Sequence, residues 1–393
     1  MSAGNSNLSS GPGHAVLADR VFDGHGWHTE AAVLIQDGRI AGVDHWSKVP
    51  EPWRRTRLSA GVFLAPGFID LQVNGGGGVL LNDQPTADGM RAIARAHRRF
   101  GTTACLPTLI SDTREKMRAA IAAARSAAGR DGILGLHLEG PFISPQRPGV
   151  HRPDRIAQAS AADLEDLREV ARAGTSLVTL APECVPAGFV RMLASSGVRV
   201  SVGHSEASAA VVMQAVEDGA TGVTHLFNVM PPLSAREPGI AGAALAEPRL
   251  TAGLIVDGIH VDPVSVRAAF AAKGAGGIAL VTDAMPTVGA ALNRFELMGR
   301  MIGFADGRLT TEEGTLAGAH LDMASAVRNT VKLAGLPLEQ ALRAASLTPA
   351  RFLGLDKERG ALIAGARADL VALDSDLTVV STWLDGSAER RMP

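Results

Sequence analysis

The sequence contains little of several residue types, and each shortage narrows what the protein can be. Among its 393 residues are two cysteines, Cys105 and Cys184, so there is no disulfide framework and a reducing cytoplasm is the expected location. The formal net charge is −2 without a basic tract, which argues against nucleic acid as the main partner. Apolar runs stop at strand length, before glycine or charged residues, and indicate no membrane span.

Apolar residues, by contrast, make up 46% of the chain and support a large folded core. Residues 1–13 are polar, rich in Gly and Ser, and unlike a signal peptide, so a flexible tail is expected there. Short alternating apolar runs fill 14–64, with a hairpin signal at Gln36–Arg39, and similar runs return at 359–393. Because the termini of a domain often lie close together, these two segments are predicted to form one small β-sandwich domain.

The middle segment, 65–358, alternates strand-like apolar runs with helical stretches rich in Ala, Arg and Glu. This alternation favours a (β/α)8 TIM-like barrel. Helices are predicted at 87–100, 113–128, 161–173, 187–196 and 207–218. The alternative is an open doubly wound sheet, which would normally carry a glycine-rich phosphate loop after its first strand, and none has the required spacing. Gly75–Gly78 opens no such helix and is expected to be a flexible loop.

Residues with metal-binding or acid–base chemistry stand where four predicted strands end. They are Glu139, His204, His225 and Asp283. The C-terminal ends of the strands line the active site of such a barrel, so the four side chains are expected on one rim. One carboxylate and two imidazoles suit zinc or a divalent ion of similar softness. A lone histidine beside an apolar run is more often a core residue, and the shared placement is therefore the stronger observation.

Asp283 allows two interpretations. A carboxylate near a metal can take the proton of an activated water, whereas an Asp in this context is also a common N-cap of a following helix. Beside the other three strand ends, the catalytic role is favoured. His137 points to the same strand face as Glu139, and is either a hydrogen-bond donor behind the site or a packed interior histidine.

Three further candidates, His151, His260 and Arg236, lie in loops expected at the same rim. The Arg236 guanidinium could bind a phosphate through two hydrogen bonds, with a salt bridge to Glu237 or a subunit contact as the alternatives. Five other histidines lie in tail, loop or helix contexts and are expected to be non-catalytic: His14, His25, His28, His45 and His97.

Ten short motifs occur in order along most of the chain. They are Pro66–Asp70, His137–Phe142, Gly149–His151, Gly203–Ser205, Thr224–Pro231, Arg236–Gly239, Asp257–His260, Thr282–Ala284, Leu316–Gly318 and Gly365–Leu370. Each motif is weak alone. Together they make the chain resemble the N-acetylglucosamine-6-phosphate deacetylases of the amidohydrolase superfamily.

The resemblance implies a metal-dependent barrel that hydrolyses the acetamide of N-acetyl-D-glucosamine 6-phosphate. It implies that Glu139, His204 and His225 hold the metal, with zinc preferred and Fe, Co or Mn as alternatives. It further implies that Asp283 is the general base and acid, and that His151 polarises the acetyl carbonyl. The matching substrate-binding residues are Val150, His151, Asn228, Val229, Arg236, His260, Leu316, Ala317 and Gly318. In the family the match to Arg236 typically comes from the neighbouring subunit, which implies a homodimer.

Two departures from the family pattern matter. Gln72 and Asn74 stand where binuclear relatives carry two histidines, so one divalent metal ion per subunit is expected. Val229 replaces an expected alanine, a change that is tolerated if this residue contributes only its backbone N–H.

Three other functions stay open. The same chemistry on N-acetylgalactosamine 6-phosphate differs only in the orientation of one hydroxyl. A cyclic-amidase or dihydroorotase-like enzyme usually needs the histidine pair and a bridging lysine, and neither is evident. A catalytically dead scaffold would suit the missing pair, but the intact Asp283 and ligand set argue against it.

Overall fold

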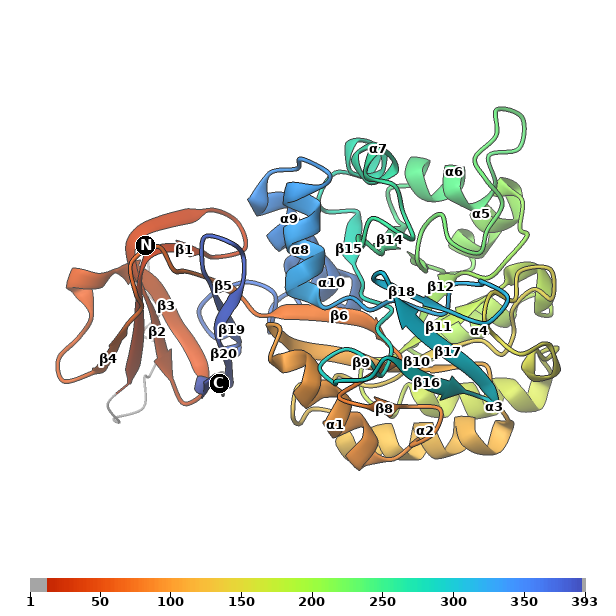
Figure 1. The fold of residues 1–393 in the computed structure, drawn as a ribbon, viewed down its shortest axis with the longest axis horizontal. Helices are drawn as coiled ribbons and strands as arrows, with labels where there is room; N and C mark the ends of the chain where they lie inside the picture. Colours follow the sequence, from red (N-terminus) through yellow and green to blue (C-terminus); the bar gives the residue numbers. More distant parts are fainter. Residues whose placement is uncertain (1–12, 391–393) are drawn as a thin grey trace.

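A computed structural model describes residues 13–390, so the predicted tail at 1–13 lies outside the described residues except for Gly13. The chain forms a small β domain beside a larger barrel, as Figure 1 shows. Among the described residues, no helix is both long and apolar enough to cross a membrane.

Eight parallel strands form the barrel, in the order β6, β9, β10, β11, β12, β13, β14 and β15. Their bounds are Phe68–Val73, Thr102–Ile110, His137–Glu139, Leu177–Leu180, Arg199–Val202, Gly222–Val223, Thr251–Leu254 and Ile278–Leu280. The ring closes where the Asp283 N–H donates to the Gln72 carbonyl at 3.0 Å and the Gly75 N–H donates to the Ala284 carbonyl at 2.8 Å. The predicted (β/α)8 architecture is confirmed.

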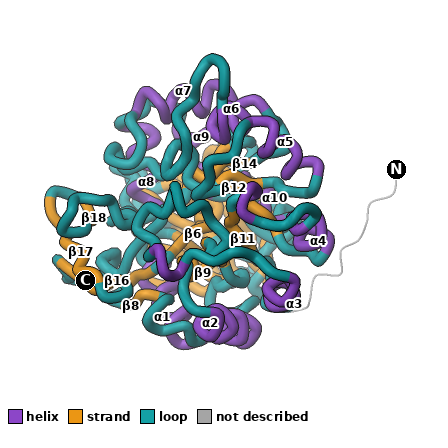
Figure 2. Tube along the Cα trace, turned by 90° about the vertical axis from the view of Figure 1, so that its right-hand side faces the viewer, coloured by secondary structure: helices purple, strands orange, loops and turns teal. Residues whose placement is uncertain are grey.

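Helices surround these strands, as Figure 2 shows. They are α1 Ala87–Arg98, α2 Arg114–Ala127, α3 Ala161–Val170, α4 Phe189–Ser195, α5 Ala209–Glu217, α6 Gly239–Ala246, α7 Pro263–Lys273, α8 Met323–Lys332, α9 Leu338–Ala345 and α10 Leu347–Leu353. Six of them begin after a side chain that accepts a backbone N–H of the first turn: Thr86, Thr113, Ser160, Ser208, Asp262 and Asp322. These caps explain why the predicted helix starts lie close to the observed ones.

The small domain is one branched sheet built from both ends of the chain. Its strands are β1 His14–Phe22, β2 Trp27–Gln36, β3 Arg39–His45, β4 Arg54–Arg57, β5 Phe63–Pro66, β19 Leu370–Leu373, β20 Val379–Leu384 and β21 Ser387–Arg390. The first half of β1 pairs with β4 and its second half with β5, so two halves of the sheet enclose one core that includes Val16, Leu64 and Trp383. This arrangement is the predicted sandwich of N- and C-terminal strands.

The predicted division of the chain stays a prediction. β5 crosses the expected boundary between 64 and 65, because its Leu64 packs in the small-domain core and its Ala65 in the barrel core. The assignment of 14–64 with 359–393 to one domain, and of 65–358 to the other, is therefore a proposal about folding units.

Two small sheets lie beside the barrel. One contains β16 Arg294–Leu297, β17 Arg300–Ala305 and β18 Arg308–Thr310. The other corrects the expectation of a flexible loop at Gly75–Gly78, because Gly75–Gly76 (β7) pairs with Val79–Leu80 (β8). A Cβ on Gly75 would lie 2.5 Å from the Val79 carbonyl oxygen, so glycine here permits close packing.

Candidate metal centre

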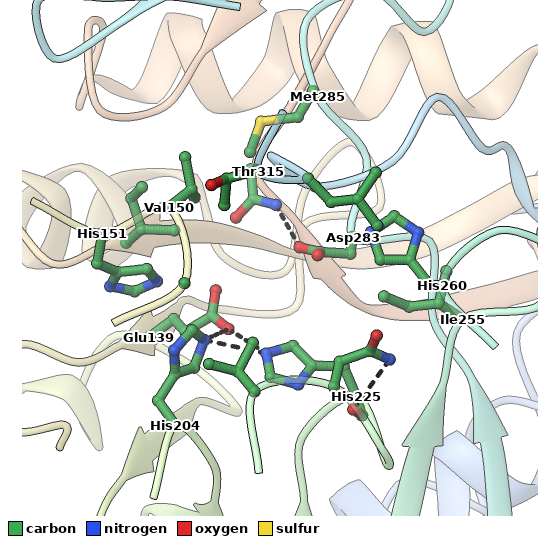
Figure 3. Close-up of a pocket in the computed structure, with 17 residues that line it drawn as sticks. Glu139, Val150, His151, His204, His225, Ile255, His260, Asp283, Met285 and Thr315 are labelled. Atoms are coloured by element: carbon green, nitrogen blue, oxygen red, sulfur yellow. Dashed lines mark hydrogen bonds and ion pairs between the residues drawn. The ribbon is translucent and has the colours of Figure 1, made fainter. Parts of the chain in front are cut away.

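The strand ends and the loops that follow them surround one cavity of about 250 Å³, drawn in Figure 3. Its lining residues are Asn74, Ile110, Glu139, Gly149, Val150, His151, His204, His225, Asn228, Val229, Ile255, His260, Asp283, Met285, Thr315, Leu316 and Gly318. Most of the predicted site residues are among them. Arg236 and Ala317 do not line this cavity.

Glu139, His204 and His225 point toward one another in Figure 3. The Glu139 Oε1 atom lies 3.1 Å from His204 Nε2 and 3.0 Å from His225 Nε2, and the two nitrogens are 3.1 Å apart. Tetrahedral ligands at about 2.0–2.2 Å from a zinc ion are spaced only slightly wider than this. The three side chains, which we call the Glu–His–His triangle, therefore have the spacing of ligands to one ion.

The hydrogen bond on the far side of His204 supports this interpretation. Its Nδ1 lies 3.0 Å from the Arg147 carbonyl oxygen, which can only accept, so Nδ1 carries the proton. The Nε2 lone pair then faces the Glu139 carboxylate oxygen, and two acceptors at that distance repel unless a cation lies between them. The donor set of these three side chains would thus fit one divalent ion.

The electrostatics of the Glu–His–His triangle also favour a bound cation. Burial raises the pKa of Glu139, but hydrogen bonds from the two imidazoles, which His204 can donate only when its ring is protonated, outweigh burial and hold that pKa well below its usual value. Burial lowers the pKa of His225, and the neighbouring Glu139 carboxylate outweighs burial and raises it. The buried negative charge therefore favours a cation here, whether a proton or a metal ion.

His151 offers an alternative third ligand, because Glu139, His151 and His204 also form a cluster that could hold a metal ion. The ligand atoms of that cluster lie within 4.8 Å of one another, a looser grouping than the 3.0–3.1 Å spacing of the Glu–His–His triangle. The His151 Nδ1 lies 2.7 Å from Ser111 Oγ and accepts from the Ser111 backbone N–H at 3.4 Å. Nε2 therefore carries the proton, and a protonated nitrogen is a donor, not a ligand. Burial, and then His204, lower the His151 pKa to about 3, which keeps the ring neutral.

Asp283 lies on the other side of the cavity beside His260 (Figure 3). Gln72 Nε2 donates to Asp283 Oδ1 at 3.0 Å and to Glu139 Oε1 at 3.0 Å, and Asn74 Nδ2 donates to the same Asp283 atom at 2.6 Å. The two amides that stand in place of the histidine pair thus hold both carboxylates. Burial, and then the Glu139 charge, raise the pKa of Asp283 to about 6. The alternative role of Asp283 as a helix cap is wrong, because residues 284–293 form no helix.

Three of these residues occupy the left-handed backbone region. The φ angles are 49° at His204, 32° at His225 and 50° at Asp283. Val229 is also there, at 52°, which is rarer still for a β-branched residue. Such conformations cost about 1–3 kcal/mol each and cluster at functional sites. Nothing in the sequence alone predicts them.

The remaining predicted residues fall into two groups. Asn228 and Val229 lie in the cavity wall, and the Asn228 amide also donates to the His225 carbonyl at 3.3 Å. His260 lies there too, with Nδ1 2.6 Å from the Asp257 carboxylate. Arg236 instead lies in the exposed loop between α5 and α6, which stands out from the body in Figure 1.

Sequence reasoning missed several residues of the site. Ser111 orients His151, and Ile110, Ile255, Met285 and Thr315 supply other parts of the cavity wall. Ser111 follows β9 directly, so its place at a strand end was the available signal.

A model of the amidohydrolase family matches residues 63–388, and the chain therefore belongs to the amidohydrolase family. It is 41% identical over 362 residues to the N-acetylgalactosamine-6-phosphate deacetylase of Shewanella sp. (strain ANA-3), and the alignment covers 90% of each chain. It is 40% identical over 385 residues to the N-acetylglucosamine-6-phosphate deacetylase of Homo sapiens, covering 90% of this chain and 93% of that one. A crystal structure of N-acetylglucosamine-6-phosphate deacetylase from Pasteurella multocida aligns with a TM-score of 0.92 at 33% identity, covering 96% and 100% of the two chains. The resemblance found in the motifs is thus confirmed.

We predict that purified protein grown with zinc contains one metal ion per chain, because Gln72 and Asn74 present amides and no imidazoles at the second position. Elemental analysis after gel filtration measures the ratio. The Glu139→Gln variant should lose the metal, since it removes the charge that holds the cation. Two ions per wild-type chain would contradict the single site.

Proposed function

We propose that the protein hydrolyses the acetamide of N-acetyl-D-glucosamine 6-phosphate, releasing D-glucosamine 6-phosphate and acetate, in amino sugar catabolism. One observation carries this proposal: a buried carboxylate, Asp283, shares one cavity with the Glu–His–His triangle. The activities named for the similar proteins of Homo sapiens and Pasteurella multocida support the substrate. The two free cysteines support a cytoplasmic location.

The Glu–His–His triangle would hold one divalent ion, and zinc is proposed because two imidazoles and a carboxylate form a common catalytic zinc set. Such an ion, when bound, lowers the pKa of a coordinated water to about 7 and polarises a carbonyl group. Fe, Co or Mn could occupy the same ligands.

Asp283 is proposed as the general base and acid. Its pKa of about 6 leaves the carboxylate ionised near neutral pH and still basic enough to take a proton from the attacking water. Gln72 and Asn74 both donate to Oδ1. Oδ2 is thus the oxygen left to receive the proton and pass it to the amine leaving group.

His151 is proposed to donate its Nε2–H to the acetyl oxygen as charge develops there. Ser111 fixes the tautomer through Nδ1, so the donor is arranged before the substrate arrives. Donors of this kind contribute about 3–4 kcal/mol to transition-state stabilisation. The other proposed substrate contacts are those of Val150, Asn228, Val229, His260 and the turn Leu316–Gly318, with backbone N–H groups serving at Val229.

The phosphate is proposed to bind Arg236 of a second subunit together with His260. Arg236 is exposed and does not line the cavity of its own chain. A homodimer in which the α5–α6 loop reaches the neighbouring cavity would bring the guanidinium to the phosphate, where it can bind two oxygens.

The galacto epimer is the second candidate substrate, because the 41% identical Shewanella protein is a deacetylase of N-acetylgalactosamine 6-phosphate. Deacetylation of the two epimers, measured side by side with and without a chelator, tests the proposal. We expect chelator-sensitive release of acetate and a higher kcat/KM for the gluco epimer. A higher value for the galacto epimer would reverse the assignment, and no turnover of either would refute it.

We predict that Asp283→Asn lowers kcat by at least about 10³-fold while metal and substrate still bind, because asparagine keeps an oxygen for the two amide donors but accepts no proton. In the wild type, kcat/KM should fall as the pH drops through about 6 or below, where Asp283 becomes protonated. Kinetics across pH, with substrate binding by calorimetry, measure both effects. Near-normal turnover by the variant would refute the role.

We predict that Arg236→Ala raises KM by roughly 10-fold or more, because a phosphate contact is lost. Mixing this variant with Asp283→Asn then tests the exchange between subunits. A mixed dimer pairs the intact Asp283 of one chain with the intact Arg236 of the other, so about a quarter of the sites should regain wild-type KM after the subunits exchange. No regain in a verified mixed dimer would place Arg236 outside the partner's site.

A further inference from the structure

Inside the barrel, just before the strand ends that carry the site, polar side chains form one continuous hydrogen-bonded chain. The Val73 N–H donates to Thr108 Oγ1 at 2.9 Å, and Thr108 Oγ1 lies 3.2 Å from His137 Nδ1. His137 Nε2 lies 2.8 Å from Thr179 Oγ1. Thr179 Oγ1 lies 2.6 Å from Thr224 Oγ1, which donates to Ser201 Oγ at 2.8 Å. We call Thr108, His137, Thr179, Thr224 and Ser201 the polar girdle.

The polar girdle ties six neighbouring strands together. Val73 lies in β6, Thr108 in β9, His137 in β10, Thr179 in β11, Ser201 in β12, and Thr224 directly follows β13. These strands are consecutive in the barrel order. All five girdle side chains are buried, in a layer that branched aliphatic residues usually fill. Buried polar groups cost free energy unless they are paired, so their presence in register on five strands calls for a reason.

The number of protons on each group fixes the direction of the hydrogen bonds between His137 and Ser201. Thr224 uses its only proton toward Ser201, so Thr179 donates to Thr224 and must accept from His137 Nε2. His137 therefore donates through Nε2. On the other side of the ring, Nδ1 lies 3.2 Å from Thr108 Oγ1, a hydroxyl that also donates to the Leu106 carbonyl at 3.1 Å. The two ring nitrogens of His137 bridge Thr108 and Thr179, so an apolar residue at 137 would break the girdle in the middle.

Several residues of the girdle and its end at Val73 lie close in sequence to residues of the metal centre. Val73 lies between Gln72 and Asn74, His137 lies two residues before Glu139, and Thr224 immediately precedes His225. Four of the strands that the girdle joins, β6, β10, β12 and β13, therefore carry or lead into the two amides and the Glu–His–His triangle. A shift of one strand by a few tenths of an ångström would move its ligand out of the triangle.

We propose that His137 is a positioning residue: through the polar girdle it holds the strand ends in the register that makes Glu139, His204 and His225 converge on one metal ion. The proposal rests on the proposed function only in taking the Glu–His–His triangle as the metal site. His137 touches neither metal nor substrate, and its effect passes through the strands.

The test is zinc affinity, measured on folded apoprotein by competition with a chromophoric chelator. His137→Leu should raise the Kd for zinc by about 10–100-fold, the range seen when groups that orient metal ligands are removed. His137→Gln keeps an amide donor that can reach Thr179, so its Kd should stay within about threefold of the wild type. Equal Kd values for His137→Leu and the wild type would overturn the proposal.

Leu167→Ala is the matched control for loss of stability. Leu167 is fully buried on α3 and belongs to the barrel core, and its aliphatic side chain has no hydrogen-bonding group to join the girdle. This variant should melt at a lower temperature and bind zinc with the wild-type Kd. A rise in Kd equal to that of His137→Leu would mean that general destabilisation weakens the site, and would also overturn the proposal.

Thr179→Val extends the test, because it removes one hydroxyl at nearly constant volume, and it can be measured alone if His137→Leu does not fold. It should raise the zinc Kd, and adding it to His137→Leu should change the Kd little further, since the girdle is then already broken. Fully additive effects would show that the hydroxyls act independently and would contradict the girdle. Wild-type protein that binds no zinc would instead refute the proposed metal site itself, so the two failures are distinguishable.

Discussion

Closure of the barrel between β6 and β15 is the constraint on which the site depends. Asp70 of β6 accepts hydrogen bonds from the Thr282 hydroxyl at 2.6 Å and from its N–H at 3.3 Å, and the Asp283 N–H reaches the Gln72 carbonyl. These contacts bring together segments that are more than 200 residues apart in the chain. Without them, Gln72 and Asn74 would not face Asp283, and the proposed base would lose the donors that orient it. The buried Asp70 carboxyl, whose pKa burial raises to about 7, therefore belongs to the closure and not to the chemistry.

Two buried carboxylates in one cavity repel each other, and the protein has to compensate for that repulsion. Burial, and then the nearby Glu139 charge, raise the pKa of Asp283. A second metal ion would neutralise the pair, but the side chains that face Asp283 from β6 and the residue after it are the amides of Gln72 and Asn74. The Gln72 amide instead donates to both carboxylates, and Asn74 donates to Asp283. An amide dipole compensates less charge than a dication does, so Asp283 keeps a pKa close to neutrality, which suits a group that must accept and then release a proton.

Sequence alone predicted the barrel, the terminal β segments and the strand-end residues, because the spacing of apolar residues and the ends of apolar runs are visible within a short stretch of sequence. Glu139, His204 and His225 stood out for that reason. The partners of Gln72 were not predictable, because its hydrogen bonds reach residues 67 and 211 positions away. Gly75 was misinterpreted as flexible, since only the packed structure shows what fills the space beside it. The girdle was out of reach as well: threonine in a strand is an ordinary β-former, and only register reveals that Thr108, Thr179 and Thr224 lie in one layer.

The left-handed backbone at His204, His225 and Asp283 shows how the strand ends are used. A strand that simply continued would send alternate side chains into and out of the barrel. A residue with positive φ at the end of a strand turns the backbone sharply into the following loop, while its side chain stays over the open end of the barrel. The strained conformations are held by backbone hydrogen bonds on the next segments: the Leu226 N–H to the Gly253 carbonyl at 2.7 Å, and the Ser144 N–H to the His204 carbonyl at 2.8 Å. Strain of this kind persists only where the surroundings determine it. The barrel below, with its strands joined by the polar girdle, is what brings these three strand ends together at one cavity.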